Sequence, residues 1–236
     1  MDVPQARSVR RHTLSVAEIE KIAAEHARGV DARRQVKEIT QRWAAGPEQM
    51  PDRVDVLYHE GDLEIDGDFR TGVELALALL VVHGDLVVNG LFEDCLDQES
   101  VVVVTGDLRA RNLISEGWLE VHGDVRVEGC AVFDHNYCTA EIFGGLSAGF
   151  IFTRYHHVEV HGQVIASLVA GDAGHIESPH DFAFVEDHDP RLAELLVPKV
   201  VLIDGDVAGE HGEDWEFHLD LGAMTDLVRA GRSPLR

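Results

Sequence analysis

Short aliphatic runs alternate with glycine–aspartate pairs through the middle of this chain. Residues 80–90 contain an apolar run, then Gly84-Asp85, then a second run in which apolar and polar side chains alternate, and residues 101–113 repeat the pattern. Short runs with a period of two predict β-strands, because successive side chains of a strand face opposite sides. Glycine permits a positive φ and aspartate can hydrogen-bond its own backbone, so each pair predicts a bend between two strands.

The glycine–aspartate pairs recur at intervals of about twenty residues. Complete Gly-Asp-Leu or Gly-Asp-Val copies begin at Gly61, Gly84, Gly106, Gly123 and Gly205, and degenerate copies stand at Gly144-Gly145 and Gly162-Gln163. One such unit cannot bury its own apolar face, whereas stacked units bury theirs against like residues of their neighbours. The pattern therefore predicts a mainly β fold, a single-stranded parallel β-helix (solenoid) over residues 54–207.

Both ends of the predicted solenoid have a different pattern. Residues 16–28 and 31–44 carry apolar side chains at helical spacing, and Ser15 with Glu18 has the form of a capping box. We expect residues 1–53 to form an α-helical hairpin that caps the open end of the solenoid, where unpaired strand edges would otherwise invite association. A hairpin that binds a partner is the alternative.

The C-terminal part is expected to form a small irregular α/β cap. Beyond residue 170 the regular coils stop, and residues 171–188 have the composition of a loop. A short helix is predicted at residues 190–196 and one further coil at residues 199–207. Residues 208–236 are expected to supply a capping strand and a final short helix.

Three histidines precede corner glycines at regular spacing. His83, His122 and His161 stand 39 residues apart, which places them on alternate coils. Alternate coils of a parallel stack lie about 9.6 Å apart, too far for these histidines to share one metal ion. We interpret them as corner side chains that hydrogen-bond a neighbouring turn or face solvent.

The coils at residues 80–89, 101–110, 119–128 and 158–166 resemble those of the bacterial polymer-forming β-helix proteins, the bactofilin type, with their apolar-x-Gly-x-apolar corners. The resemblance covers roughly residues 54–170. The chain also resembles a related group of uncharacterised bacterial β-helix proteins that have the same Gly-Asp-Leu coils. For the bactofilin type it implies a parallel β-helix that assembles end to end.

Charge is divided unevenly along the chain. The first 53 residues contain 10 Lys+Arg and 8 Asp+Glu, a net charge of +2, whereas the rest contains 10 and 35, a net charge of −25. A negative field repels nucleic-acid phosphates and anionic lipids, so we expect neither nucleic acid nor membrane as a partner. It would speed encounter with a basic protein, and the alternative interpretation is that it only keeps a sheet-rich molecule soluble.

The sequence also predicts a cytoplasmic location. No apolar run approaches the eighteen or so residues that span a bilayer, and the first residues do not follow a signal-peptide pattern. The three cysteines, Cys95, Cys130 and Cys138, lack a C-x-x-C pair and are interpreted as reduced thiols.

Two polar segments stand out as a candidate site. The sequence has no P-loop, dinucleotide-binding, zinc-protease or serine-hydrolase motif. Residues 134–138 and 154–157 fall at comparable phases of neighbouring coils, because His135 and His156 are 21 residues apart. If the protein is an enzyme, His135 and His156 are the candidate acid and base, since imidazole titrates near neutral pH. Weak metal-ligand candidates are Asp134, His135, Cys138, His156 and His157.

We favour a structural role for these residues, because Asp, Asn and His commonly hydrogen-bond the turns of such a fold. A second polar group is interpreted as a solvated loop and comprises His175, Glu177, His180, Asp181, Asp187, His188 and Asp189. We expect no cofactor and no bound metal.

Three classes of function remain. We expect a non-catalytic acidic β-helix scaffold that acts through protein–protein contacts, for example as a cytoplasmic immunity or antitoxin-like factor for a basic partner. The first alternative is a bactofilin-like structural protein that acts by self-association. The second is a β-helix enzyme with a His-rich edge site, which lacks the orderly carboxylate pair that glycoside hydrolysis requires.

Overall fold

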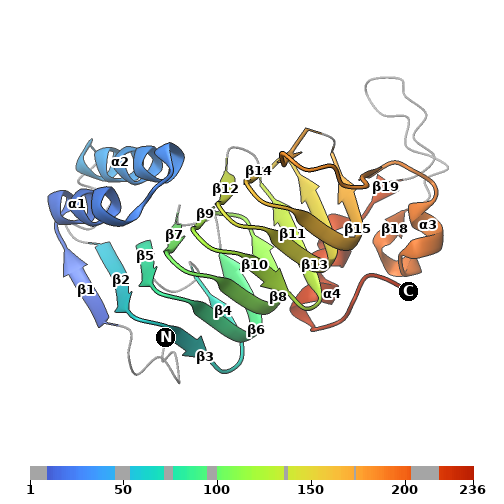
Figure 1. The fold of residues 1–236 in the computed structure, drawn as a ribbon, viewed down its shortest axis with the longest axis horizontal. Helices are drawn as coiled ribbons and strands as arrows, with labels where there is room; N and C mark the ends of the chain where they lie inside the picture. The colour runs from blue at the N-terminus through green and yellow to red at the C-terminus, as the bar shows by residue number, and fades with distance from the viewer. Residues whose placement is uncertain are drawn as a thin grey trace.

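The structure, a computed structural model, confirms the predicted parallel β-solenoid. It describes residues 10–45, 54–71, 77–94, 100–135, 138–172, 174–202 and 218–236. Successive coils stack along the long axis of the molecule, with the N-terminal coils at one end and the C-terminal coils at the other (Figure 1).

Two long sheets form the walls of the solenoid. Sheet A consists, in spatial order, of β1 (Arg10–Leu14), β2 (Val54–Glu60), β5 (Leu77–His83), β7 (Val101–Val104), β9 (Trp118–Val121), β12 (Thr139–Ile142), β14 (His157–Val160) and β16 (Ile176–Glu177). Sheet B contains β3 (Leu63–Ile65), β4 (Phe69–Arg70), β6 (Leu86–Asp94), β8 (Leu108–Ser115), β10 (Val125–Val127), β11 (Cys130–Asp134), β13 (Leu146–Arg154), β15 (Val164–Gly171) and β17 (Val185–Glu186). From β2 onward the pairs in both sheets are parallel, as the repeat predicts.

Each coil turns three corners. The first is the glycine–aspartate corner between sheets A and B. The second bends sheet B itself, and in two coils it divides the strand into β3 and β4 or into β10 and β11. The third returns the chain to sheet A, and it differs most in length: six residues separate β6 from β7, but only two separate β8 from β9.

The first corner explains why aspartate follows glycine. The carboxylate Oδ1 of Asp85 accepts the backbone N–H of Asp107 at 2.9 Å, and Asp107 accepts that of Asp124 at 2.9 Å. A Cβ atom on Gly106 would lie 2.2 Å from this Asp85 oxygen, so only glycine leaves room for it. Each aspartate therefore binds its coil to the next one.

Aliphatic side chains fill the interior in register. Leu86, Leu108 and Val125 occupy equivalent positions of consecutive coils and are fully buried. Truncating either leucine to alanine costs about 2–5 kcal/mol in well-packed cores. This interior is the main source of stability for a stack whose single coils cannot fold alone.

The N-terminal helical cap is confirmed, and it covers the solenoid from the side. It consists of α1 (Val16–His26) and α2 (Val30–Ala45), and Ser15 and Glu18 form the predicted capping box. The hairpin packs on the outer face of the first coils of sheet A, above them in Figure 1. There Ile19 and Val36 are buried with Val103. The first edge of sheet A is instead paired by β1, which runs antiparallel to β2.

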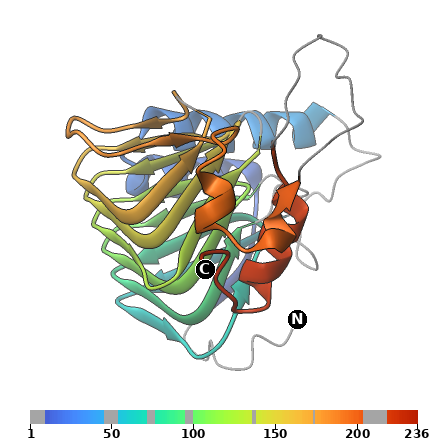
Figure 2. The same ribbon diagram turned by 90° about the vertical axis from the view of Figure 1, so that its right-hand side faces the viewer.

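The C-terminal segment also packs laterally, along the part of sheet B that follows the second corner (Figure 2). It comprises α3 (Leu192–Leu195), the 3₁₀ turn η2 (Pro198–Val200), β18 (Val201–Leu202), β19 (His218–Leu219) and α4 (Leu221–Arg229). Met224 and Val228 of α4 are buried in one cluster with Ile114 and Phe152 of the coils. A second apolar layer thus covers this side of the stack.

Two C-terminal predictions need correction. Residues 199–202 do not begin a further coil, because β18 pairs antiparallel with β19 in a sheet of their own, and residues 203–207 lie outside the described residues. Conversely, the region expected as a loop contains β16 and β17, which extend both sheets. Phe182 and Phe184 lie between these strands and pack against the interior at this end.

Candidate functional site

The residues singled out in the sequence lie at the third corner, where neighbouring coils are in register. Asp134 ends β11 and pairs with Arg154 at the end of β13, with 3.7 Å between the Asp134 Oδ1 and Arg154 Nε atoms. His135 and Tyr155 follow directly and both have positive φ angles, 154° and 58°. The structure therefore brings the two segments together as predicted, whereas Asn136 and Tyr137 lie outside the described residues.

His156 occupies a structural position. Its ring is fully buried 5.9 Å from the ring of Phe133, and neither ring nitrogen has a hydrogen-bond partner among the described residues. Burial, with a smaller contribution from the charge of His135, lowers the pKa of His156 to about 3. A neutral imidazole without access to solvent cannot exchange protons with a substrate, so this geometry does not favour the predicted pairing of His135 with His156 in acid–base catalysis.

The predicted metal candidates do not converge within the described chain. Cys138 is buried against the hairpin side of sheet A in a cluster with Trp118. Among the described residues, one group places three ligand atoms within 4.8 Å of one another, and it contains Glu141, Glu159 and His161. The weak candidates Asp134, His135, Cys138, His156 and His157 and the second polar group at residues 175–189 are not part of it. Carboxylate and imidazole donors of this kind suit Zn²⁺ or Mn²⁺.

A buried carboxyl that the sequence analysis missed supports the third corner. Asp94 accepts the backbone N–H groups of Glu116 at 2.7 Å and Gly117 at 3.0 Å, and the Ser115 hydroxyl at 3.0 Å. Burial raises the pKa of Asp94 to about 6, against these hydrogen bonds. Asp94 is the last residue of β6, but nothing in the neighbouring sequence indicates that the next coil supplies its partners.

Glu93, which precedes Asp94, joins the C-terminal helix to the coils. Arg229 of α4 donates to Glu93 Oε1 from its Nε atom at 2.9 Å and from Nη2 at 2.6 Å. The Nε atom of Arg70 lies 3.1 Å from the other oxygen, Oε2. Burial also raises the pKa of Glu116, Asp134 and Asp172 along this corner. These carboxyls are held in a structural network, and arginines partly compensate their charge.

A column of glutamates runs along the outer face of sheet A. Glu120, Glu141, Glu159 and Glu177 occupy equivalent positions of consecutive coils and are called here the glutamate column. In the preceding coils the same position holds Val103 and Val81, which lie beneath the helical hairpin. The face thus changes from apolar to acidic where the hairpin ends.

The predicted corner histidines flank this column. The ring of His161 stacks on that of Phe143, with centroids 4.8 Å apart and 3° between the planes, and the rings of His122 and Phe143 are nearly perpendicular, with centroids 5.6 Å apart. His122 Nε2 lies 2.6 Å from Glu120, and His161 Nε2 lies 3.4 Å from Glu141. Burial raises the pKa of Glu141, and the negative charges of Glu120 and Glu159 raise it further.

The outer face of sheet B between the first and second corners has a different charge balance. Two shallow depressions there, of about 350 and 400 Å³, meet at Arg126. Arg126 forms ion pairs with Asp107 and Asp124, and Arg109 lies near Asp107 and Asp85. Guanidinium groups thus compensate aspartates on this face, whereas the ion pairs of the glutamate column, within the described residues, are with histidines.

No protein-family model, curated protein or solved structure matches this chain. The resemblance to bactofilin-type proteins therefore stays a prediction. In the described part of the chain, none of the helices combines the length and apolar character needed to cross a bilayer.

Proposed function

We propose that this protein is a non-catalytic binding module that recognises a basic protein partner. The net charge of −25 beyond residue 53 supports a cationic partner, because charge complementarity speeds encounter and suppresses wrong partners. The buried position of His156 argues against the alternative of catalysis at the third corner.

The observation that carries the proposal is the glutamate column. Two sides of the coil are covered by the chain's own helices, whereas the column continues past the hairpin onto β14 and β16. The side chains of Glu159 and His161 there are 45% and 40% exposed. Parallel strands about 4.8 Å apart hold carboxylates closer together than their mutual repulsion favours, and a cationic partner would relieve that repulsion.

Co-purification from the native host tests the proposal. Tagged protein is captured at about 50 mM salt and washed at about 300 mM salt, and the bound proteins are identified by mass spectrometry. We expect a basic protein that is released by the salt wash, because added ions screen exposed charges. Capture of an acidic protein, retention through the salt wash, or no stoichiometric partner would each contradict the proposal.

The self-assembly alternative receives less support from the ends of the stack. A parallel continuation at the first edge of sheet A would have to replace β1, which is antiparallel to its neighbour. At the other end Phe182 and Phe184 pack against the interior. Both arrangements oppose the addition of a further coil at these two places.

A further inference from the structure

Helix α2 docks on the glutamate column through its N-terminus. Glu120 is 1% exposed and accepts the backbone N–H groups of Arg28 at 2.5 Å and Gly29 at 2.9 Å, directly before α2. A Cβ atom on Gly29 would lie 2.0 Å from Glu141 Oε2, so the next glutamate of the column also faces this helix end. The arrangement pairs negative carboxylates with the positive end of the helix dipole and its free N–H groups.

An arginine beside the helix end completes this contact. The guanidinium carbon of Arg28 lies 4.7 Å from the centroid of the Phe143 ring, and that ring also stacks on His161. A cation over an aromatic face adds attraction to the carboxylate contacts. Glu120 of the column thus binds backbone N–H groups at the helix end, and Phe143 at the neighbouring corner binds the side chain of Arg28.

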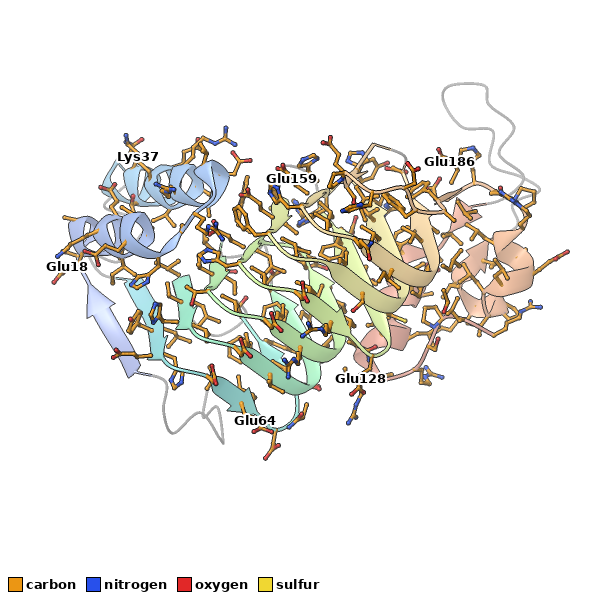
Figure 3. All side chains as sticks on the ribbon, viewed as in Figure 1. Glu18, Lys37, Glu64, Glu128, Glu159 and Glu186 are labelled. Atoms are coloured by element: carbon orange, nitrogen blue, oxygen red, sulfur yellow. The ribbon has the colours of Figure 1, made fainter. Side chains whose placement is uncertain are left out.

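The same chemistry continues beyond the hairpin. Glu159 and Glu177 follow Glu141 in register on β14 and β16. Glu159 lies on the same side of the solenoid as Lys37 of α2, and Glu64 and Glu128 lie on the opposite side (Figure 3). Among the described residues, the ion-pair partner of Glu159 is His161, at 3.7 Å.

We propose that Glu159 and Glu177, with His161 beside them, form a docking surface for the N-terminal turn of a basic helix in a partner protein. The surface is continuous with the intramolecular contact that already holds α2, and its charge complements such a helix. This inference rests on the proposed function and adds the location of the interface and the element that it recognises.

A basic helix copied from this chain provides the probe. A fluorescein-labelled peptide with the sequence of residues 26–45 contains Arg28 and Gly29 and carries a net charge of +3, from 5 Lys+Arg and 2 Asp+Glu. Its affinity for the intact protein is measured by fluorescence anisotropy at about 50 mM salt. The test variant is Glu159→Gln with Glu177→Gln, and the control is Glu64→Gln with Asp66→Asn, which removes the same charge on the opposite side.

We expect the test variant to bind the peptide about ten-fold more weakly than wild type, since two carboxylates at a helix N-terminus contribute roughly 1–2 kcal/mol. The control variant should stay within about two-fold of wild type, and Arg28→Ala in the peptide should weaken binding to the wild-type protein. Thermal unfolding of both variants checks that these exposed substitutions leave the fold intact.

Several results would overturn the inference. They are the absence of peptide binding, equal losses in the test and control variants, and binding of Zn²⁺ at the column with no binding of the peptide. Capture of the native partner separates this inference from the proposed function. If a basic partner binds the test variant as well as it binds wild type, the docking surface is wrong but the proposed function stands. If no basic partner is captured, both the docking surface and the proposed function are contradicted.

Discussion

At the scale of single residues, the corner aspartates connect coils that are distant in sequence. Partial burial of Asp107 opposes its ionisation, but hydrogen bonds from the Asp124 N–H and from Arg126 and Arg109 outweigh burial and lower its pKa. At the second corner Asn112 accepts the Cys130 N–H at 3.0 Å in a similar way. An uncharged amide oxygen can therefore replace a corner carboxylate as acceptor.

This comparison predicts unequal effects of two substitutions at Asp107. Asp107→Ala leaves the N–H of Asp124 without its acceptor and should lower the free energy of unfolding by about 1–3 kcal/mol. Asp107→Asn keeps an acceptor oxygen and should cost less than half as much. Urea unfolding of the three proteins at pH 7 provides the measurement, and equal losses in both variants would show that charge rather than the hydrogen bond matters.

His156 is expected to make the fold sensitive to acid. Its folded pKa of about 3 lies below the ordinary value of 6.5, so below pH 6.5 the unfolded chain binds a proton that the folded protein excludes. This contribution to stability is complete above pH 6.5 and is lost as pH falls, by about 2 kcal/mol at pH 5.

Replacing His156 should therefore flatten the pH profile. In His156→Phe the free energy of unfolding should fall by about 2 kcal/mol less than in wild type between pH 7.5 and pH 5. Urea unfolding at both pH values tests this, with the exposed His180→Gln as the control that should follow wild type. Parallel profiles for wild type and His156→Phe would contradict the proposed cause.

At the scale of secondary-structure elements, a buried carboxylate determines how the hairpin docks. Glu120→Ala removes the acceptor for the N–H groups of Arg28 and Gly29, and contacts of this charged kind contribute roughly 1.5–3 kcal/mol. We expect faster hydrogen exchange in α1 and α2 and little change in β8 or β13. The exposed substitution Glu177→Gln should leave the exchange of the hairpin as in wild type, and unchanged exchange in Glu120→Ala would contradict this docking role.

The coil strands and the two N-terminal helices could be predicted from the sequence, whereas β1, β16 and β17 were missed. Strand length and period, the capping box at Ser15 and the apolar spacing of the two N-terminal helices are local properties, so each indicated its element without knowledge of the stack. The second corner was missed, because Gly90 and Gly129 lack the repeated aspartate that marks the first corner. The lateral position of the hairpin was also missed, since it depends on Val81 and Val103 facing outward in two separate coils.

The candidate site was predictable only in part. Register brought Asp134 beside Arg154, as a repeat of about twenty residues implies. The burial of His156 could not be predicted, because it depends on Phe133 and on the way in which neighbouring third corners close. The repeat places the four glutamates of the column at equivalent positions of consecutive coils. Which of them are exposed depends on where the hairpin ends, and the sequence does not indicate this.

At the scale of the whole molecule, the covered first edge of sheet A, the packed C-terminal end and an acidic surface predict that the protein does not polymerise. Antiparallel β1 opposes a parallel continuation of sheet A at the first end, and Phe182 and Phe184 pack against the interior at the other. A formal net charge of −23 also repels like copies. Analytical ultracentrifugation at physiological salt should show a monomer or small oligomer, and sedimenting filaments would instead support the bactofilin-like alternative.

Differences in length between coils are concentrated largely at one edge, the third corner, and this has a practical consequence. Within this chain the connections at the third corner vary from two to six residues, and the strands that follow them still pair in register. A foreign epitope grafted into this edge would therefore be displayed on a rigid backbone without disturbing the layers above and below it. The same peptide inserted beside Gly106 would separate two coils that the Asp85 carboxylate joins.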